Sequence, residues 1–210
     1  MEKGSVPIAV LISGRGSNLA AIARAIDDGR LRARIAVVVS NRSDAPGLEI
    51  ARGRGIPALV RSHTDFPSRD AYDGWLVESL QSFQVSLVCL AGFMRRLGAT
   101  FCAAFPNAIL NIHPSLLPAF PGVDAQRHAL EHGVKVAGAT VHFVTPELDA
   151  GPIVLQAAVP VEDTDTADSL SARILREEHR LYPAAIQRVL DGGWRIEGRR
   201  VIFDSSSRRV

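Results

Sequence analysis

The sequence predicts an α/β fold: an open, doubly wound, mostly parallel sheet with helices on both faces and an antiparallel C-terminal extension. Short apolar runs rich in β-branched residues are typical of strands that are buried on both faces. Segments with apolar residues at helical spacing stand between these runs, and this alternation favours right-handed crossovers between parallel strands. Two longer apolar runs near the C-terminus are separated by one loop, which indicates an antiparallel pair.

The first half of the chain contains most of the predicted parallel sheet. Strands are expected over 6–12, 35–40, 56–60, 85–91 and 108–112, with helices over 19–26, 45–54 and 68–83. Gly29 and Gly55 follow two of these helices as stop signals. Because ligands of open α/β sheets bind beyond the carboxyl ends of the strands, the loops after these strands are the first candidates for a site.

The second half has a different pattern. Strands are expected over 134–144 and 153–161, followed by a helix over 168–190 and a hairpin over 194–203 that turns at Glu197-Gly198. We expect one domain over residues 1–204, with two halves over 1–110 and 111–204. Residues 205–210 are expected to form a disordered tail.

Composition excludes several classes of protein. The 210 residues are 47% hydrophobic and 22% charged, which is ordinary globular usage. With 24 Lys and Arg against 22 Asp and Glu, the net charge of +2 gives no sign of a nucleic-acid partner. No apolar run reaches the ~18 residues that a membrane span needs. Cys89 and Cys102 are expected to be reduced and buried, so the sequence predicts a cytoplasmic protein.

A glycine-rich loop follows the first predicted strand, with the sequence Ser-Gly-Arg-Gly-Ser-Asn-Leu over 13–19. Its glycines allow a close backbone approach, Ser17 or Asn18 could cap the following helix, and the free amides there attract anions. A dinucleotide site would need glycine in place of Leu19 and an acid in place of Asn41, and the Gly-Lys-Ser/Thr of a P-loop is missing. The loop therefore suits a phosphomonoester, with a simple tight turn as the alternative.

Asn111 and His113 form the most specific pattern of the sequence. They are two residues apart, so on a strand their side chains point the same way, and Pro114 keeps His113 out of helical geometry. An amide and an imidazole side by side could donate hydrogen bonds to an oxyanion, and the imidazole could transfer a proton near neutral pH. The alternative is a structural histidine in an apolar segment.

A carboxylate is needed beside such a histidine, and the loop over 147–152, which contains Glu147 and Asp149, can supply one. A carboxylate near His113 would stabilise the imidazolium form. An aspartate in such a loop, taken alone, is most often a turn residue, and His142 is expected to be structural or a supporting residue. Neither a nucleophile elbow nor a metal-ligand spacing adjoins these residues, which favours direct attack of one substrate on another and no metal.

The sequence resembles the folate-dependent phosphoribosylglycinamide formyltransferase family. The matching stretches are 12–19, 68–73, 90–95, 111–118, and 141–144 with 149–152. The stretch over 111–118 and the Asp-x-Gly segment are specific to the wider formyltransferase family, and the Gly-x-Gly-Ser-Asn loop to the ribonucleotide branch. Two residues depart from the pattern: Asp124 stands where some members have histidine, and Arg15 where others have Asn or Ser.

The resemblance implies that the half over 1–110 binds phosphate and the ribonucleotide and that the half over 111–204 is catalytic and binds folate. It also implies roles residue by residue. The catalytic trio of the family corresponds to Asn111, His113 and Asp149. The phosphate-binding turn corresponds to Gly16, Ser17 and Asn18, and the acid that contacts the ribonucleotide corresponds to Glu178. The folate-site contacts implied are Arg69, Met94, Arg95, Arg96, Leu97, Asn111, Thr145, Pro146, Glu147, Leu148 and Asp149.

The implied reaction moves a formyl group from 10-formyltetrahydrofolate, a co-substrate, to the glycine amine of phosphoribosylglycinamide in purine biosynthesis. Small-molecule substrates are expected, without nucleic acid, membrane or metal, in a monomer or homodimer. The rivals are a 10-formyltetrahydrofolate hydrolase and a non-catalytic folate- or nucleotide-binding module. Methionyl-tRNA formyltransferase shares the chemistry, but we do not expect its additional C-terminal tRNA-binding domain here, nor the N-terminal regulatory domain usual in the hydrolase.

Overall fold

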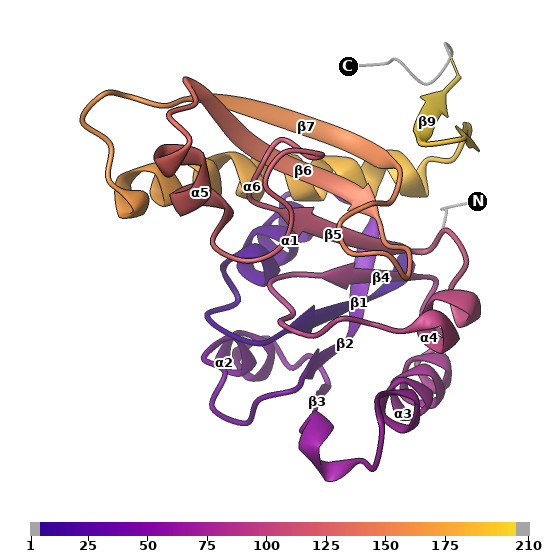
Figure 1. Cartoon of the computed structure of the whole chain (residues 1–210). Helices are drawn as coiled ribbons and strands as arrows, with labels where there is room; N and C mark the ends of the chain where they lie inside the picture. The colour runs from indigo at the N-terminus through magenta and orange to yellow at the C-terminus, as the bar shows by residue number, and fades with distance from the viewer. Residues whose placement is uncertain (1–4, 205–210) are drawn as a thin grey trace. The chain divides into compact units, whose positions relative to one another are not determined.

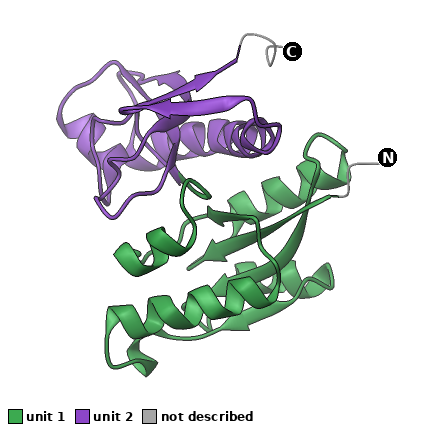
Figure 2. Cartoon of the chain, turned by 90° about the vertical axis from the view of Figure 1, so that its right-hand side faces the viewer, with its two compact units in different colours: residues 1–111 green, residues 112–210 purple. Residues whose placement is uncertain are grey.

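The computed structural model describes residues 5–204, which form two compact units (Figure 2). The division lies between Asn111 and Ile112. The tail expected over 205–210 lies outside the described residues, and the expected single domain over 1–204 stays a prediction.

The first unit is built on a parallel sheet, as the apolar runs predicted. Its strands are β1 (Val6–Ile12), β2 (Ala33–Ser40), β3 (Ala58–Val60), β4 (Leu87–Leu90) and the first part of β5 (Ile109–His113), in the order β3-β2-β1-β4-β5. Strand β5 crosses the division, so its residues Ile112 and His113 belong to the second unit. The pairs β1–β2, β1–β4, β2–β3 and β4–β5 are all parallel. The side chains of Ile8 to Ile12 are fully buried, as expected of a central strand with helices on both faces.

Helices cover both faces of this sheet. The helices are α1 (Ser17–Asp27), α2 (Gly47–Gly53), α3 (Arg69–Ser82) and α4 (Ala99–Ala104), with a 3-10 turn, η1 (His63–Asp65). Figure 1 shows α1 and α2 on one side of the sheet and α3 and α4 on the other. This arrangement confirms the doubly wound fold.

The second unit is built on an antiparallel pair. Its elements are α5 (Ala125–Glu131), β6 (Val136–Phe143), β7 (Ile153–Pro160), α6 (Ala167–Leu190), β8 (Trp194–Glu197) and β9 (Arg200–Phe203). Strand β6 pairs antiparallel with β7, and α6 packs along both strands (Figure 1). The strand order there is β6-β7-β9-β8, and β8 and β9 form the expected antiparallel hairpin.

Three sequence-based expectations need correction. The C-terminal hairpin turns at Gly198-Arg199, because Glu197 still pairs with Arg200. Cys102 is only half-buried, unlike Cys89, because the residue that the short helix α4 buries is its neighbour Phe101. Neither α4 nor α5 was predicted. Their only buried residues are one phenylalanine in α4 and two alanines in α5, so no apolar stripe marks them.

None of the helices within residues 5–204 combines the length and the apolar character that a membrane crossing requires.

Candidate active site

Strand β5 carries Asn111 and His113 at its C-terminal end. The imidazole of His113 is buried, and Asn111 is half-buried. Residues two apart on a strand share a face, so the strand directs both side chains the same way. The strand ends at His113, one residue beyond the predicted end at 112, and Pro114 follows it.

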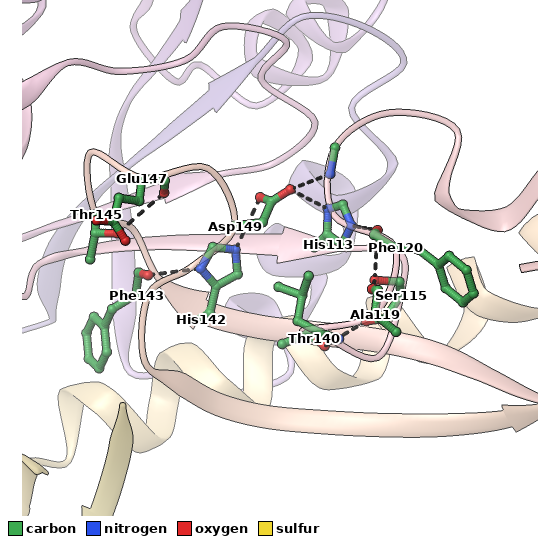
Figure 3. A network of polar contacts seen from close by, with 12 residues as sticks. His113, Ser115, Ala119, Phe120, Thr140, His142, Phe143, Thr145, Glu147 and Asp149 are labelled. Carbon is green, nitrogen blue, oxygen red and sulfur yellow. Dashed lines mark hydrogen bonds and ion pairs between the residues drawn. The ribbon is translucent and has the colours of Figure 1, made fainter. Parts of the chain in front are cut away.

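Asp149 lies in the loop between β6 and β7, with its side chain between two histidines (Figure 3). Its Oδ2 is 3.5 Å from Nδ1 of His113, and its Oδ1 is 3.7 Å from Nε2 of His142. The N–H of Gly122 donates a hydrogen bond of 2.8 Å to Oδ2. The carboxylate is 9% exposed and its neighbour His113 7%. In such a poorly solvated place an ion pair is screened less than at the surface.

Both ring nitrogens of His113 face oxygen atoms that can only accept. Nδ1 faces the carboxylate of Asp149, and Nε2 donates a hydrogen bond of 2.9 Å to the carbonyl of Phe120. The carbonyl of Phe120 also accepts from the hydroxyl of Ser115 at 3.2 Å. The segment after β5 therefore folds back onto the histidine.

His142 was expected to be a supporting residue, and the structure places it directly beside Asp149. Its Nδ1–H donates a hydrogen bond of 2.9 Å to the carbonyl of Phe143. Burial lowers the pKa of His142, against the smaller opposite effects of that hydrogen bond and of the Asp149 charge. The ring is therefore neutral near pH 7. The only signal for this residue in the sequence is its place on the strand that leads to the Asp149 loop.

The lowered pKa of His142 predicts a pH dependence of stability. The unfolded chain binds a proton at this side chain near the ordinary value of 6.5, whereas the folded protein binds it only at lower pH. As the pH falls below about 6.5, the unfolded state takes up more protons, so the free energy of unfolding decreases. His142→Gln removes this loss. We expect its free energy of unfolding in urea to fall less between about pH 7.5 and pH 5 than that of the wild type.

The matched control for this measurement is His128→Gln, which alters a half-buried histidine in α5. It should keep the pH slope of the wild-type protein. If His142→Gln had the same slope as the wild type, the depressed proton affinity of His142 would be wrong.

Gly151 closes the loop that holds Asp149. A Cβ atom there would stand 1.8 Å from the carbonyl oxygen of Phe143. The N–H of Phe143 donates to the carbonyl of Pro152 at 2.9 Å, so the loop returns tightly to the end of β6. Glycine at 151 is what allows this approach, and the approach holds Asp149 near His142. The expected folate contacts Thr145, Pro146, Glu147 and Leu148 belong to the same loop, and the Leu148 residue is 55% exposed.

The glycine loop has a different cap from the one the sequence suggested. Gly16 is the N-cap of α1, with φ 75°, and no side chain caps the helix. Ser17 is already the first helical residue, so the expectation that Ser17 or Asn18 caps α1 is wrong. A Cβ atom on Gly16 would meet Cα of Gly47 at 2.7 Å. Close packing of the loop on α2 therefore explains Gly16 by itself, and its part in phosphate binding stays a prediction.

The other predicted binding residues lie in both units. In the first unit, Arg69 begins α3 and is exposed, and the expected folate contacts over 94–97 lie in the loop between β4 and α4. Met94 is 70% exposed in that loop and Leu97 is buried. Glu178 is buried on α6 in the second unit. The roles of these residues in binding stay predictions.

Comparison with known proteins assigns the family. Residues 6–186 match the family model described as formyl transferase, and the chain therefore belongs to the formyl transferase family. It is 46% identical to phosphoribosylglycinamide formyltransferase of Escherichia coli, over 88% of this chain and 87% of that protein. Glycinamide ribonucleotide transformylase 1 of Symbiobacterium toebii has a similar structure, with a TM-score of 0.94 and 58% identity, covering 97% of this chain and 96% of the other.

Longer proteins also contain a similar region. The chain is 46% identical to the trifunctional purine biosynthetic protein adenosine-3 of Gallus gallus over 91% of its own length, but it spans only 19% of that protein.

Proposed function

We propose that this chain transfers a formyl group from 10-formyltetrahydrofolate to the glycine amine of 5′-phosphoribosylglycinamide. The products are 5′-phosphoribosyl-N-formylglycinamide and tetrahydrofolate, in de novo purine biosynthesis. The buried pair of His113 and Asp149, in a chain of the formyl transferase family, is the observation that carries this proposal. The similarity to phosphoribosylglycinamide formyltransferases over nearly whole chains supports the choice of acceptor.

In the proposed reaction, the amine of the glycine moiety attacks the formyl carbon, and the carbonyl oxygen becomes an oxyanion. Asn111 would donate a hydrogen bond to the oxyanion from its side-chain amide, and His113 would donate one from Nε2. To do so, Nε2 would give up its hydrogen bond to the carbonyl of Phe120. Nδ1 of His113 stays on Asp149, which balances the positive ring. Two donors aimed at the developing charge, one of them cationic, stabilise the tetrahedral intermediate.

A proton must leave the attacking amine, and one must reach the folate nitrogen before its bond to the formyl carbon breaks. Asp149 would orient His113 and help to move this proton through a water molecule, because its carboxylate faces the imidazole and is fixed by the N–H of Gly122. His142 donates its one ring proton from Nδ1 to the carbonyl of Phe143, so its Nε2 faces the carboxylate without a proton and could take up a proton there, but cannot donate one. No covalent intermediate on the protein and no metal are part of the proposal.

The substrates would bind at the predicted loops. Gly16, Ser17 and Asn18 would hold the phosphate at the N-terminus of α1, where backbone amides favour an anion. Glu178 would contact the ribonucleotide, and the folate would lie against Arg69, the loop over 94–97, Asn111 and the loop over 145–149. Partners would be limited to small molecules, and the cytoplasmic location and the choice between monomer and homodimer stay predictions.

One assay separates this function from its rivals. The purified chain is mixed with 10-formyltetrahydrofolate, with and without phosphoribosylglycinamide, and tetrahydrofolate formation is followed. We expect release of tetrahydrofolate only with the acceptor present, in equal amounts with the formylated product. Release at the same rate without acceptor would show a hydrolase, and no release in either mixture would show a binding module.

A further inference from the structure

The loop between β4 and α4, residues 93–98, is held at both ends by buried side chains that belong to other elements. One is Ser13, just after β1, and the other is Asp73, on α3. Neither is among the predicted site residues, and all of these residues lie in the first unit.

Ser13 fixes the start of the loop. Its hydroxyl accepts a hydrogen bond of 2.7 Å from the N–H of Met94 and donates one of 2.5 Å to Oδ1 of Asn41. Because the only hydroxyl proton points to Asn41, the serine oxygen is oriented to accept from Met94. The backbone of Ser13 adds a bond of 3.1 Å to the carbonyl of Gly92. Ser13 is 6% exposed, so water competes little for these bonds.

Asp73 fixes the end of the loop. Its Oδ2 accepts a hydrogen bond of 2.7 Å from the N–H of Gly98, and a Cβ atom on Gly98 would stand 2.8 Å from that oxygen. The residue is 1% exposed, and its other oxygen, Oδ1, is buried with no hydrogen-bond partner among the described residues. A buried carboxylate with an unsatisfied oxygen is expensive to keep. The interaction that this carboxylate makes is the hydrogen bond from the backbone N–H of Gly98 to Oδ2.

The residues between these two hydrogen bonds, 94–97, belong to neither a strand nor a helix. Met94 is 70% exposed and Arg96 is exposed, whereas Leu97 is buried and fastens the loop from within. A short loop held at both ends loses little conformational freedom when a ligand binds, and preorganisation of this kind increases affinity.

We propose that Ser13 and Asp73 are positioning residues that hold the 93–98 loop in the conformation that binds the formyl-folate co-substrate. The inference rests on the proposed function, because it takes this loop as part of the folate site. Neither residue contacts a substrate in this proposal. Each acts through one backbone N–H of the loop.

The test compares Michaelis constants for the two substrates. Asp73→Ala removes the acceptor for Gly98, and Ser13→Ala removes the acceptor for Met94. In each variant we expect KM for 10-formyltetrahydrofolate to rise about tenfold, the loss expected for roughly one hydrogen bond. The kcat value and KM for phosphoribosylglycinamide should change less than about twofold. Asp73→Asn keeps an oxygen acceptor for Gly98 and should restore most of the affinity for folate.

Two matched controls accompany these variants. Glu78→Gln alters an exposed acid on the same helix as Asp73, and Ser82→Ala removes an exposed hydroxyl at the end of that helix. Both should leave the Michaelis constants unchanged. If Asp73→Ala does not fold, Ser13→Ala and the binding measurement decide the question.

Direct binding separates this inference from the proposed function. Titration calorimetry with tetrahydrofolate should show an affinity about tenfold weaker for Ser13→Ala and Asp73→Ala than for the wild type. Equal affinities, or a fall in kcat with both Michaelis constants unchanged, would overturn the positioning role. A wild-type protein that binds tetrahydrofolate but fails to formylate phosphoribosylglycinamide would instead contradict the proposed function and leave the titration as the test of the loop.

Discussion

His113→Ala is expected to reduce kcat for formyl transfer by roughly 100-fold or more. In the proposed mechanism the imidazole is the cationic hydrogen-bond donor to the oxyanion, and Oδ2 of Asp149 lies 3.5 Å from its Nδ1. Alanine removes the donor and the positive charge together, which is the kind of loss that costs on the order of 3 kcal/mol of transition-state stabilisation. KM for either substrate should change far less than kcat, because the interaction forms mainly in the transition state.

The measurement is steady-state kinetics with both substrates, on protein whose circular dichroism and thermal unfolding show a native fold. His128→Ala is the matched control, because it deletes a half-buried imidazole from α5 that has no part in the proposed chemistry. It should retain wild-type turnover. A folded His113→Ala variant with near-normal kcat would refute the oxyanion role of this histidine.

Asp149→Asn should have an effect of similar size, reducing kcat on the order of 100-fold. The amide has nearly the volume of the carboxylate, and its oxygen can still accept from the N–H of Gly122. What it lacks is the negative charge that stabilises the His113 imidazolium and the basicity to help move the amine proton. The loop should therefore keep its structure while the chemistry fails.

Asp163→Asn serves as the control for a lost carboxylate, since Asp163 is an exposed partner of Lys135. Its kcat should equal that of the wild type. An Asp149→Asn enzyme that kept more than half of its kcat, or lost only substrate affinity, would show that Asp149 shapes the loop and takes no part in proton transfer.

The parallel sheet was predictable because buried strands must be almost wholly apolar, and Val6–Ile12 and Leu87–Leu90 stand out for that reason. The short helices α4 and α5 were not, because a helix of six or seven residues can be fixed by one or two buried side chains. The cap of α1 was misjudged because Gly16 takes a left-handed conformation under close packing from Gly47, a constraint that only the tertiary structure imposes.

The candidate site was predictable only in part. Asn111 and His113 are neighbours in sequence, so strand alternation alone places them on one face. The choice of Asp149 depended on the family resemblance, since no spacing rule links a strand end to a carboxylate in a distant loop. The contacts from Phe120 and Gly122 had no signal at all, because they come from backbone groups that every residue possesses.

The buried anchors Ser13 and Asp73 were missed for a related reason. A single polar residue inside an apolar segment looks the same in sequence whether it satisfies the core or holds a distant loop. Only the coordinates show that the Ser13 hydroxyl and the Asp73 carboxylate each receive a backbone N–H of the loop over 93–98.

The double variant His113→Ala/Asp149→Asn tests most directly whether imidazole and carboxylate work as one unit. When two residues act as a unit, either single substitution already removes most of their joint contribution to kcat. Replacing the second residue should then lower kcat little further. We expect kcat of the double variant to lie within a few-fold of that of His113→Ala. A double variant whose loss equals the product of the two single losses would show that the two side chains act independently and would contradict the account.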